Sequence, residues 1–204
     1  PKTERVITIE DSAELQIHGI ENLVRMEVRQ ADGDGVSNVT LRDLIRTSLR
    51  MRPDRIIVGE VRGEEALDMI QSMNTGHDGS LSTGHANSPQ DMLSRLETMA
   101  LFASDIPIQA IRKQIASSID IIVQLERLRD RSRRVTAIAE VLDCTEDAYI
   151  LNPIFEFHEQ DNLVMESSSY GDIPERVVGQ LERTGYHLMH RRKLHAAALE
   201  SAEI

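Results

Sequence analysis

Short apolar runs alternate with segments of helical periodicity along the first half of this 204-residue chain. Apolar residues dominate 6–9, where only Thr8 is polar, and are contiguous at 56–58, as in buried strands; they alternate with polar residues over 23–29. The small-residue stretch 79–86 is expected to be a further core strand. Because helical segments separate these strands, the pattern predicts an α/β fold with a mostly parallel sheet flanked by helices.

The starts of two helices are marked by capping residues. Thr40 and Asp43 match the capping-box pattern, and Ser88 is followed by Pro89 and Asp91, which favour a first helical turn. Leucine and isoleucine then recur at helical spacing. We therefore expect helices over residues 41–49, 64–73, from 89 onward and from 107 onward.

The last part of the chain has a different pattern. Strands are expected at 119–125, 135–142 and 149–157, the last two as an antiparallel pair at the edge of the fold. A turn-rich stretch at 167–174 then leads into sequence that predicts helix through Leu199. We predict two parts, a partial catalytic domain over residues 1–158 and a turn-rich and helical C-terminal extension over 159–204.

Composition narrows the class of protein. The formal net charge of −11 argues against a nucleic-acid surface, so no nucleic-acid partner is expected. A single cysteine, Cys144, excludes an internal disulfide framework and favours a reducing compartment. The chain shows no secretory signal and no apolar run of membrane-spanning length. It begins with Pro1 and reaches a strand within a few residues, so we expect a fragment that lacks its amino-terminal part.

An acid follows the most apolar strand directly. Residues 52–63 read RPDRIIVGEVRG, in which Gly59 and Glu60 end the run and Arg62 follows. The carboxyl ends of parallel strands are where open α/β sheets bind ligands, and a carboxylate there orients water or supports a metal in nucleotide hydrolases. An exposed acid just past a strand is the simpler alternative.

A pair of acids, Glu10 and Asp11, follows the first strand. These carboxylates either orient water or hold the water shell of a metal, or they only favour a helix amino-terminus through its dipole. Residues 75–87 carry His77 and His85 on either side of a glycine-rich strand, together with hydroxyl donors suited to phosphate. Ordinary loop histidines are the alternative for each, and no cysteine or HExxH spacing supports zinc.

Taken together, these segments resemble the type II/type IV secretion ATPase family, and most of all its CpaF-like branch from tight-adherence (Flp) pilus assembly. Residues 9–15 resemble the aspartate box of the family, residues 49–63 its atypical Walker B segment and residues 75–89 its histidine box. The resemblance covers residues 4 to about 157. It implies a RecA-like P-loop NTPase core with antiparallel edge strands and C-terminal helices.

The resemblance also implies roles for individual residues. Glu60 is then the Walker B carboxylate that supports water and Mg²⁺ from the second shell, without a direct bond to the metal. Glu10, with Asp11, is the aspartate-box acid near the attacking water. The implied nucleotide-binding or sensing residues are His77, His85, Arg25, Arg29 and Arg62.

The whole protein is then expected to be an ATP-hydrolysing motor that uses ATP and Mg²⁺. The family forms homo-hexamers that work with inner-membrane platform proteins at the cytoplasmic face of the cell membrane. The sequence departs from the family in one respect, because no G-x-x-x-x-G-K-[ST] phosphate loop occurs in these 204 residues. We therefore predict that this chain alone binds ATP poorly and hydrolyses none.

Two alternatives stay open at the level of sequence. One is a non-enzymatic RecA-like assembly module that acts through its surfaces. The other is a conjugation or type IV secretion ATPase of the same superfamily.

Overall fold

The computed structural model describes residues 2–31, 37–77, 79–160 and 176–191. The chain divides into two compact units, residues 1–119 and residues 120–204, and each is described by itself.

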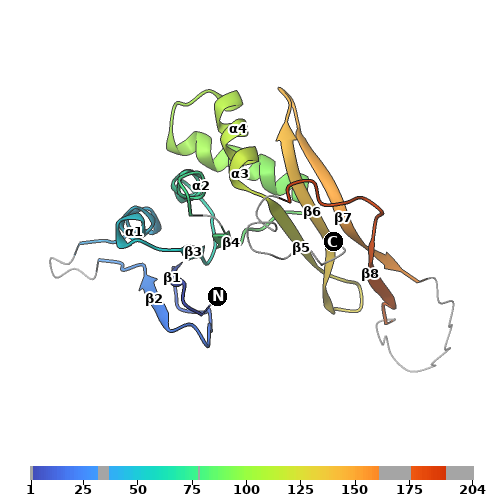
Figure 1. Cartoon of the computed structure of the whole chain (residues 1–204), viewed down its shortest axis with the longest axis horizontal. Coiled ribbons are helices and arrows are strands. Elements are labelled where there is room, and N and C mark those ends of the chain that lie inside the picture. The colour runs from blue at the N-terminus through green and yellow to red at the C-terminus, as the bar shows by residue number, and fades with distance from the viewer. Residues whose placement is uncertain (1, 32–36, 78, 161–175, 192–204) are drawn as a thin grey trace. The chain divides into compact units, whose positions relative to one another are not determined.

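The first unit contains a four-stranded parallel sheet (Figure 1). Its strands β1 (Arg5–Glu10), β2 (Asn22–Glu27), β3 (Arg55–Val58) and β4 (Leu81–Ser82) lie in the order β2-β1-β3-β4. Ile7 pairs with Ile56 and Ile9 with Val58, and all four side chains are buried. These β-branched residues pack well on a pleated surface and form the sheet side of the core.

Four α-helices complete the described part of this unit, with a short 3-10 turn, η1 (Leu49–Met51), after the first. α1 (Leu41–Ser48) packs on β1 and β2, whereas α2 (Glu65–Met73) packs against α1, α3 (Pro89–Ala103) and α4 (Ile108–Ser118). The helical core is aliphatic and includes Ile45, Ile70, Leu93, Ile111 and Ile115. Burying each such side chain contributes about 1.5–3 kcal/mol.

The parallel arrangement brings three loops to one edge of the sheet. β1, β3 and β4 all end there, and the backbone N–H of Gly59 donates to the carbonyl of Ile9 at 2.8 Å. The N–H of Val61 donates to the carbonyl of Thr83 at 3.0 Å. The segments after the three strands are therefore neighbours although they are far apart in the sequence.

The second unit contains an antiparallel sheet in the order β5-β6-β7-β8. Its strands are β5 (Ile121–Arg127), β6 (Arg133–Cys144), β7 (Tyr149–Glu159) and β8 (Gly179–Arg183). The carboxylate of Glu140 on β6 is fully buried and accepts hydrogen bonds from Asn152 and from the backbone of Met189 and His190. This acid therefore attaches the segment after β8 to the sheet.

The predicted α/β fold, with a parallel sheet flanked by helices and antiparallel strands after it, is confirmed. Both predicted helix starts are also confirmed, because Thr40 and Asp43 form a capping box and Ser88 accepts from the N–H of Asp91. The division of residues 1–158 from 159–204 stays a prediction.

Two expectations were wrong in detail. The strand expected over 79–86 is reduced to Leu81–Ser82, since these residues pair only with β3. Residues 179–183 form β8 where helix was predicted, because pairing with β7 outweighs local helical preference. Residues 176–178 and 184–191 are also not helical. The predicted turn-rich stretch at 167–174 and the end of the predicted helix, from residue 192 on, lie outside the described residues.

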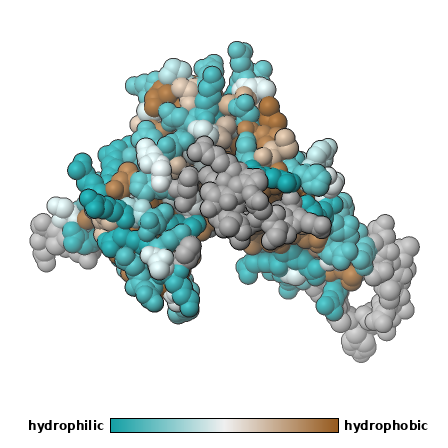
Figure 2. Space-filling view, viewed as in Figure 1, coloured by the Kyte–Doolittle hydropathy of each residue, from teal (hydrophilic) through white to brown (hydrophobic). Residues whose placement is uncertain are grey.

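Exposed apolar side chains gather at the turn between α3 and α4, and Figure 2 shows brown atoms over this end of the first unit. The exposed apolar side chains at this turn are those of Leu101, Phe102 and Ile108. Among the described residues, no helix combines the length and apolarity needed to cross a bilayer.

Candidate functional site

The carboxylate of Glu60 lies between two nitrogen-bearing side chains at the carboxyl edge of the parallel sheet. The guanidinium of Arg62 donates from Nη2 to Oε2, and Nε2 of His85 lies 3.1 Å from Oε1. The Glu60 side chain is 17% exposed, whereas that of His85 is 81% exposed. The acid is therefore largely covered, and its partners reach it from the solvent side.

Electrostatics keep this acid ionised. The hydrogen bond from Arg62 outweighs burial and, with the positive charges of Arg62 and Arg95, lowers the pKa of Glu60 below its ordinary value. A carboxylate that is ionised at neutral pH can accept a hydrogen bond from water.

The backbone on both sides of Glu60 is fixed by the loop after β4. Thr83 donates from Oγ1 to the carbonyl of Gly59 at 2.6 Å, and its own carbonyl accepts from the N–H of Val61. Thr83 is therefore hydrogen-bonded to the residue before Glu60 and to the residue after it. Since His85 follows two residues later, the same loop positions both members of the pair.

The predicted aspartate-box acid lies on the adjacent strand. Glu10 is buried, and its Oε1 accepts from the N–H groups of Glu14 and Leu15 at 3.0 and 2.9 Å. A Cβ atom on Gly59 would lie 3.0 Å from Cγ of Glu10. Glycine at position 59 thus lets the Glu10 side chain lie against the loop that carries Glu60.

Asp11 and Glu14 extend this acidic end toward Arg62. The hydrogen bond to Glu60 raises the pKa of Arg62, and the charges of Asp11 and Glu14 raise it further. Both acids are exposed. The positive charge of Arg62 is therefore stabilised by carboxylates from two loops, the one after β1 and the one after β3.

Sequence reasoning missed Arg95. This residue lies on α3 and donates from Nη1 to the carbonyl of His85 at 2.8 Å. Its charge also contributes to the lowered pKa of Glu60. A lone arginine ten residues after the histidine carries no sequence signal, since the contact depends on how α3 packs.

The structure separates the two histidines of the histidine box. His77 follows α2 and precedes β4, and its Nδ1 lies 3.1 Å from the carbonyl of Ser72. Nearby, Arg55 at the amino end of β3 donates to the carbonyl of Gly79. His77 is therefore at the amino edge of the sheet, whereas His85 is at the carboxyl edge, and the sensing role of His77 stays a prediction.

The two predicted arginines of the β2 region are exposed and contact nearby backbone. Arg25 donates to the carbonyl of Ile17 at 3.1 Å, and Arg29 donates to that of Ser37 at 3.4 Å. These contacts hold the loops around β2. The nucleotide-binding role of this pair stays a prediction.

The described residues at this edge of the sheet offer an incomplete set of ligands for a metal ion. Among the described residues, no group of three or more His, Cys, Asp and Glu side chains is arranged to hold one. Both oxygens of Glu60 already have partners, and Oε1 of Glu10 has two.

The chain is similar in sequence to known secretion-system and conjugal transfer proteins. The family model described as "Type II/IV secretion system protein" matches residues 1–169. A putative conjugal transfer protein of Mycobacterium tuberculosis is 40% identical over 136 residues, which are 67% of this chain and 38% of that protein. The type IV secretion system protein PtlH of Bordetella pertussis is 36% identical over 137 residues, which are 66% of this chain and 40% of that protein.

A solved structure shares the fold. The VirB11 ATPase from the Brucella suis type IV secretion system, solved in complex with sulphate, superposes with a TM-score of 0.60 at 32% sequence identity. The match covers 69% of this chain and 41% of that protein. The matched part of the chain thus spans about two fifths of the length of each of these three proteins, and the RecA-like fold class of the chain is confirmed.

Proposed function

Because this chain belongs to the type II/IV secretion system protein family, we propose that it carries the water-activating side of an ATP site in a secretion or pilus-assembly motor. The observation that supports this proposal is the Glu60 carboxylate, held between Arg62 and His85 at the carboxyl edge of a parallel sheet. An ionised acid flanked by an arginine and a histidine suits a reaction between water and a phosphate.

The reaction is transfer of the γ-phosphoryl group of ATP to water. In this reaction the oxygen of the attacking water bonds to the γ-phosphorus and the proton of the water passes to a γ-phosphate oxygen. The bond from phosphorus to the bridging oxygen breaks, which releases ADP and inorganic phosphate. Glu60 accepts a hydrogen bond from that water and orients it, as acids in this position do in nucleotide hydrolases. Glu10, with Asp11, adds carboxylates near this water from the end of the neighbouring strand.

The nitrogen-bearing side chains at this edge suit contact with the oxygens of a phosphate. Arg62 and His85 contact the acid in the structure, and Arg95 holds the His85 backbone. A phosphate that enters this edge would compete with Glu60 for Arg62 and His85, which frees the carboxylate to accept from water. Arg25, Arg29 and His77 are proposed to reach nucleotide from outside this cluster.

The remaining parts of the site and the assembly belong to the proposal for the whole protein. ATP and Mg²⁺ are the proposed ligands, and residues of the Walker A type would supply the main phosphate contacts. We propose a homo-hexamer that acts with inner-membrane platform proteins at the cytoplasmic face of the membrane.

Two branches of the family are proposed for the machine that this motor drives. The wording of the motifs in residues 9–15, 49–63 and 75–89 favours tight-adherence pilus assembly of the CpaF type. The conjugal transfer and type IV secretion relatives favour a conjugation or protein-secretion machine instead. Deleting the gene in its own host and scoring surface pili, conjugation and protein export would distinguish the two.

The test of the ATPase proposal uses the full-length protein that contains this sequence. Glu60→Gln keeps the shape of the side chain and removes its charge. We expect the turnover number to fall by about 10²–10⁴-fold, with the dissociation constant of ATP unchanged within roughly twofold, because Glu60 acts on water. Retained turnover would refute the role of Glu60.

A matched control is Glu21→Gln, which makes the same chemical change at an exposed position just before the amino end of β2. Its turnover should equal that of the unmodified protein. If the protein is a non-enzymatic assembly module, neither the unmodified protein nor either variant should hydrolyse ATP. The 204-residue chain by itself is expected to show none, and turnover above background there would contradict that expectation.

A further inference from the structure

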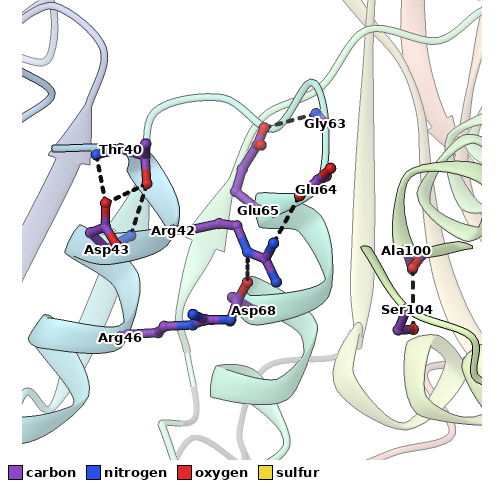
Figure 3. A network of polar contacts seen from close by, with 10 residues as sticks. All are labelled: Thr40, Arg42, Asp43, Arg46, Gly63, Glu64, Glu65, Asp68, Ala100 and Ser104. Atoms are coloured by element: carbon purple, nitrogen blue, oxygen red, sulfur yellow. Dashed lines mark hydrogen bonds and ion pairs between the residues drawn. The ribbon is translucent and has the colours of Figure 1, made fainter. Parts of the chain in front are cut away.

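The loop that carries Glu60 runs directly into α2, and α2 is attached to α1 by ion pairs (Figure 3). Arg42 on α1 donates from Nε to Oδ2 of Asp68 at 2.6 Å and from Nη1 to Oε2 of Glu64 at 2.8 Å. Arg46, one turn further on, donates from Nε to the other Asp68 oxygen at 2.7 Å. One guanidinium therefore holds two acids that lie one helical turn apart at the start of α2.

Asp68 is the anchor of this arrangement. Its side chain is only 8% exposed, and both of its oxygens accept from arginine. A buried carboxylate is stable when its charge is paired and its oxygens are hydrogen-bonded. The hydrogen bond to Asp68 raises the pKa of Arg42, and the Glu64 charge adds to this effect.

Glu64 marks the point where the loop becomes helix. It is the N-cap residue of α2, and its side chain makes no capping hydrogen bond there. The loop backbone just before the helix is held by Glu65 instead, whose Oε1 accepts from the N–H groups of Arg62 and Gly63 at 2.6 and 2.8 Å. The Glu64 side chain is thus available for Arg42.

The segment between Glu60 and α2 is therefore held from both sides. Thr83 fixes its beginning at Gly59 and Val61, and Arg42 fixes its end through Glu64. Only a few residues separate these two attachments, and the chain between them has little freedom once both are made.

We propose that Arg42 is a positioning residue of the site, which fixes the Glu60 carboxylate by holding Glu64 and Asp68 at the start of α2. This inference rests on the proposed function for its effect on turnover. Its mechanical part, the rigidity of residues 61–65, does not depend on that function.

The geometry also specifies the residue type. Arg42 uses two different nitrogens, Nε and Nη1, for two acids on successive helical turns. A lysine has one ammonium at the end of a flexible stem and cannot reproduce this fork. Arg42→Lys should therefore behave much more like Arg42→Gln than like the unmodified protein.

The first experiment measures amide hydrogen exchange in the 204-residue chain. Arg42→Gln and Arg42→Lys are expected to speed exchange at residues 61–65 by about tenfold, with exchange in α4 unchanged. Arg46→Gln is the matched comparison, because Arg46 donates to Asp68 whereas Arg42 also donates to Glu64. Its effect on this loop should be clearly smaller. Arg50→Gln, at an exposed position of η1, should leave the exchange as it is.

The second experiment measures ATP hydrolysis by the full-length protein. Arg42→Gln should lower kcat by about three- to tenfold and leave KM within roughly twofold, because only the orientation of Glu60 changes. In a Glu60→Gln background the same substitution should have almost no further effect, since the residue that it positions no longer acts. A purely structural role of Arg42 would lower activity equally in both backgrounds.

The outcomes separate the two proposals. Unchanged exchange at residues 61–65, or faster exchange with unchanged kcat in an active protein, overturns the role of Arg42. If the full-length protein hydrolyses no ATP, the proposed function fails, whereas faster loop exchange in Arg42→Gln would still establish the attachment of the loop to α1.

Discussion

The ion pair between α3 and α4 makes a quantitative prediction about stability. Arg112 donates from Nε to Oε1 of Glu97 at 2.6 Å and from Nη2 to Oε2 at 3.1 Å. The two side chains are 11% and 10% exposed, so this is a bidentate and largely buried pair. Arg112→Ala would leave the Glu97 carboxylate buried without this partner.

The expected loss is about 3–5 kcal/mol in the free energy of unfolding, the usual effect of removing one member of a buried pair. With a urea dependence of about 2 kcal/mol per molar, this corresponds to a fall in the urea midpoint of roughly 2 M. Such a loss is a large fraction of the total stability of about 5–15 kcal/mol expected for a folded domain.

Urea titration followed by circular dichroism at a helix-sensitive wavelength is the suitable assay. All described α-helices lie in the first unit, so the signal reports on the unit that contains the pair. Lys113→Ala, at the next and exposed position, is the matched control and should change stability by less than about 0.5 kcal/mol. The double variant Glu97→Leu with Arg112→Leu should recover most of the loss, since apolar residues can replace a buried pair.

A fall of less than about 1 kcal/mol in Arg112→Ala would refute this reasoning, because an exposed pair contributes only that much. The same conclusion would follow if the double variant were as unstable as Arg112→Ala alone.

Two further predictions concern the second unit. The pKa of Asp130 is lowered to about 2 by hydrogen bonds from the Ser132 side chain and backbone and from the Val177 N–H. The ionised Asp130 therefore stabilises the fold fully above its unfolded pKa of about 3.9, and this contribution is lost as the pH falls toward 2. Asp130→Asn should therefore flatten the loss of stability in acid over that window, as measured by urea titrations at several pH values, and an unchanged profile would contradict the assignment. Glu140→Gln should speed proteolysis near residues 187–190, because the buried carboxylate holds the Met189 and His190 backbone. Glu146→Gln, at an exposed turn, is the control. Equal cleavage of the two variants would show that this attachment is dispensable.

Local features of the fold could be predicted from the sequence. The capping residues Thr40 and Ser88 act within one helical turn, so their pattern determines where α1 and α3 begin. The apolar run at 56–58 could be assigned as a buried strand because its β-branched residues leave few other options. The position of Glu60 at the strand end followed from that assignment.

Features that depend on packing could not be predicted. The strand at 179–183 forms by pairing with β7, and its own residues carry no clear strand pattern. The contact of Arg95 with His85 and the attachment of Arg42 to Glu64 join residues from separate helices and loops. The separation of His77 from His85 also follows from sheet direction, since β4 lies between them.

The central claim is that Glu60 orients the water that attacks the phosphate while His85, beside it, contacts that phosphate, and a double-variant cycle on ATP turnover by the full-length protein tests it most directly. The structure places His85 Nε2 at 3.1 Å from the Glu60 carboxylate. Groups that act together show strongly non-additive effects on rate, so Glu60→Gln with His85→Ala should be about as slow as Glu60→Gln alone. Losses that multiply in the double variant would contradict the claim, as would full turnover in His85→Ala.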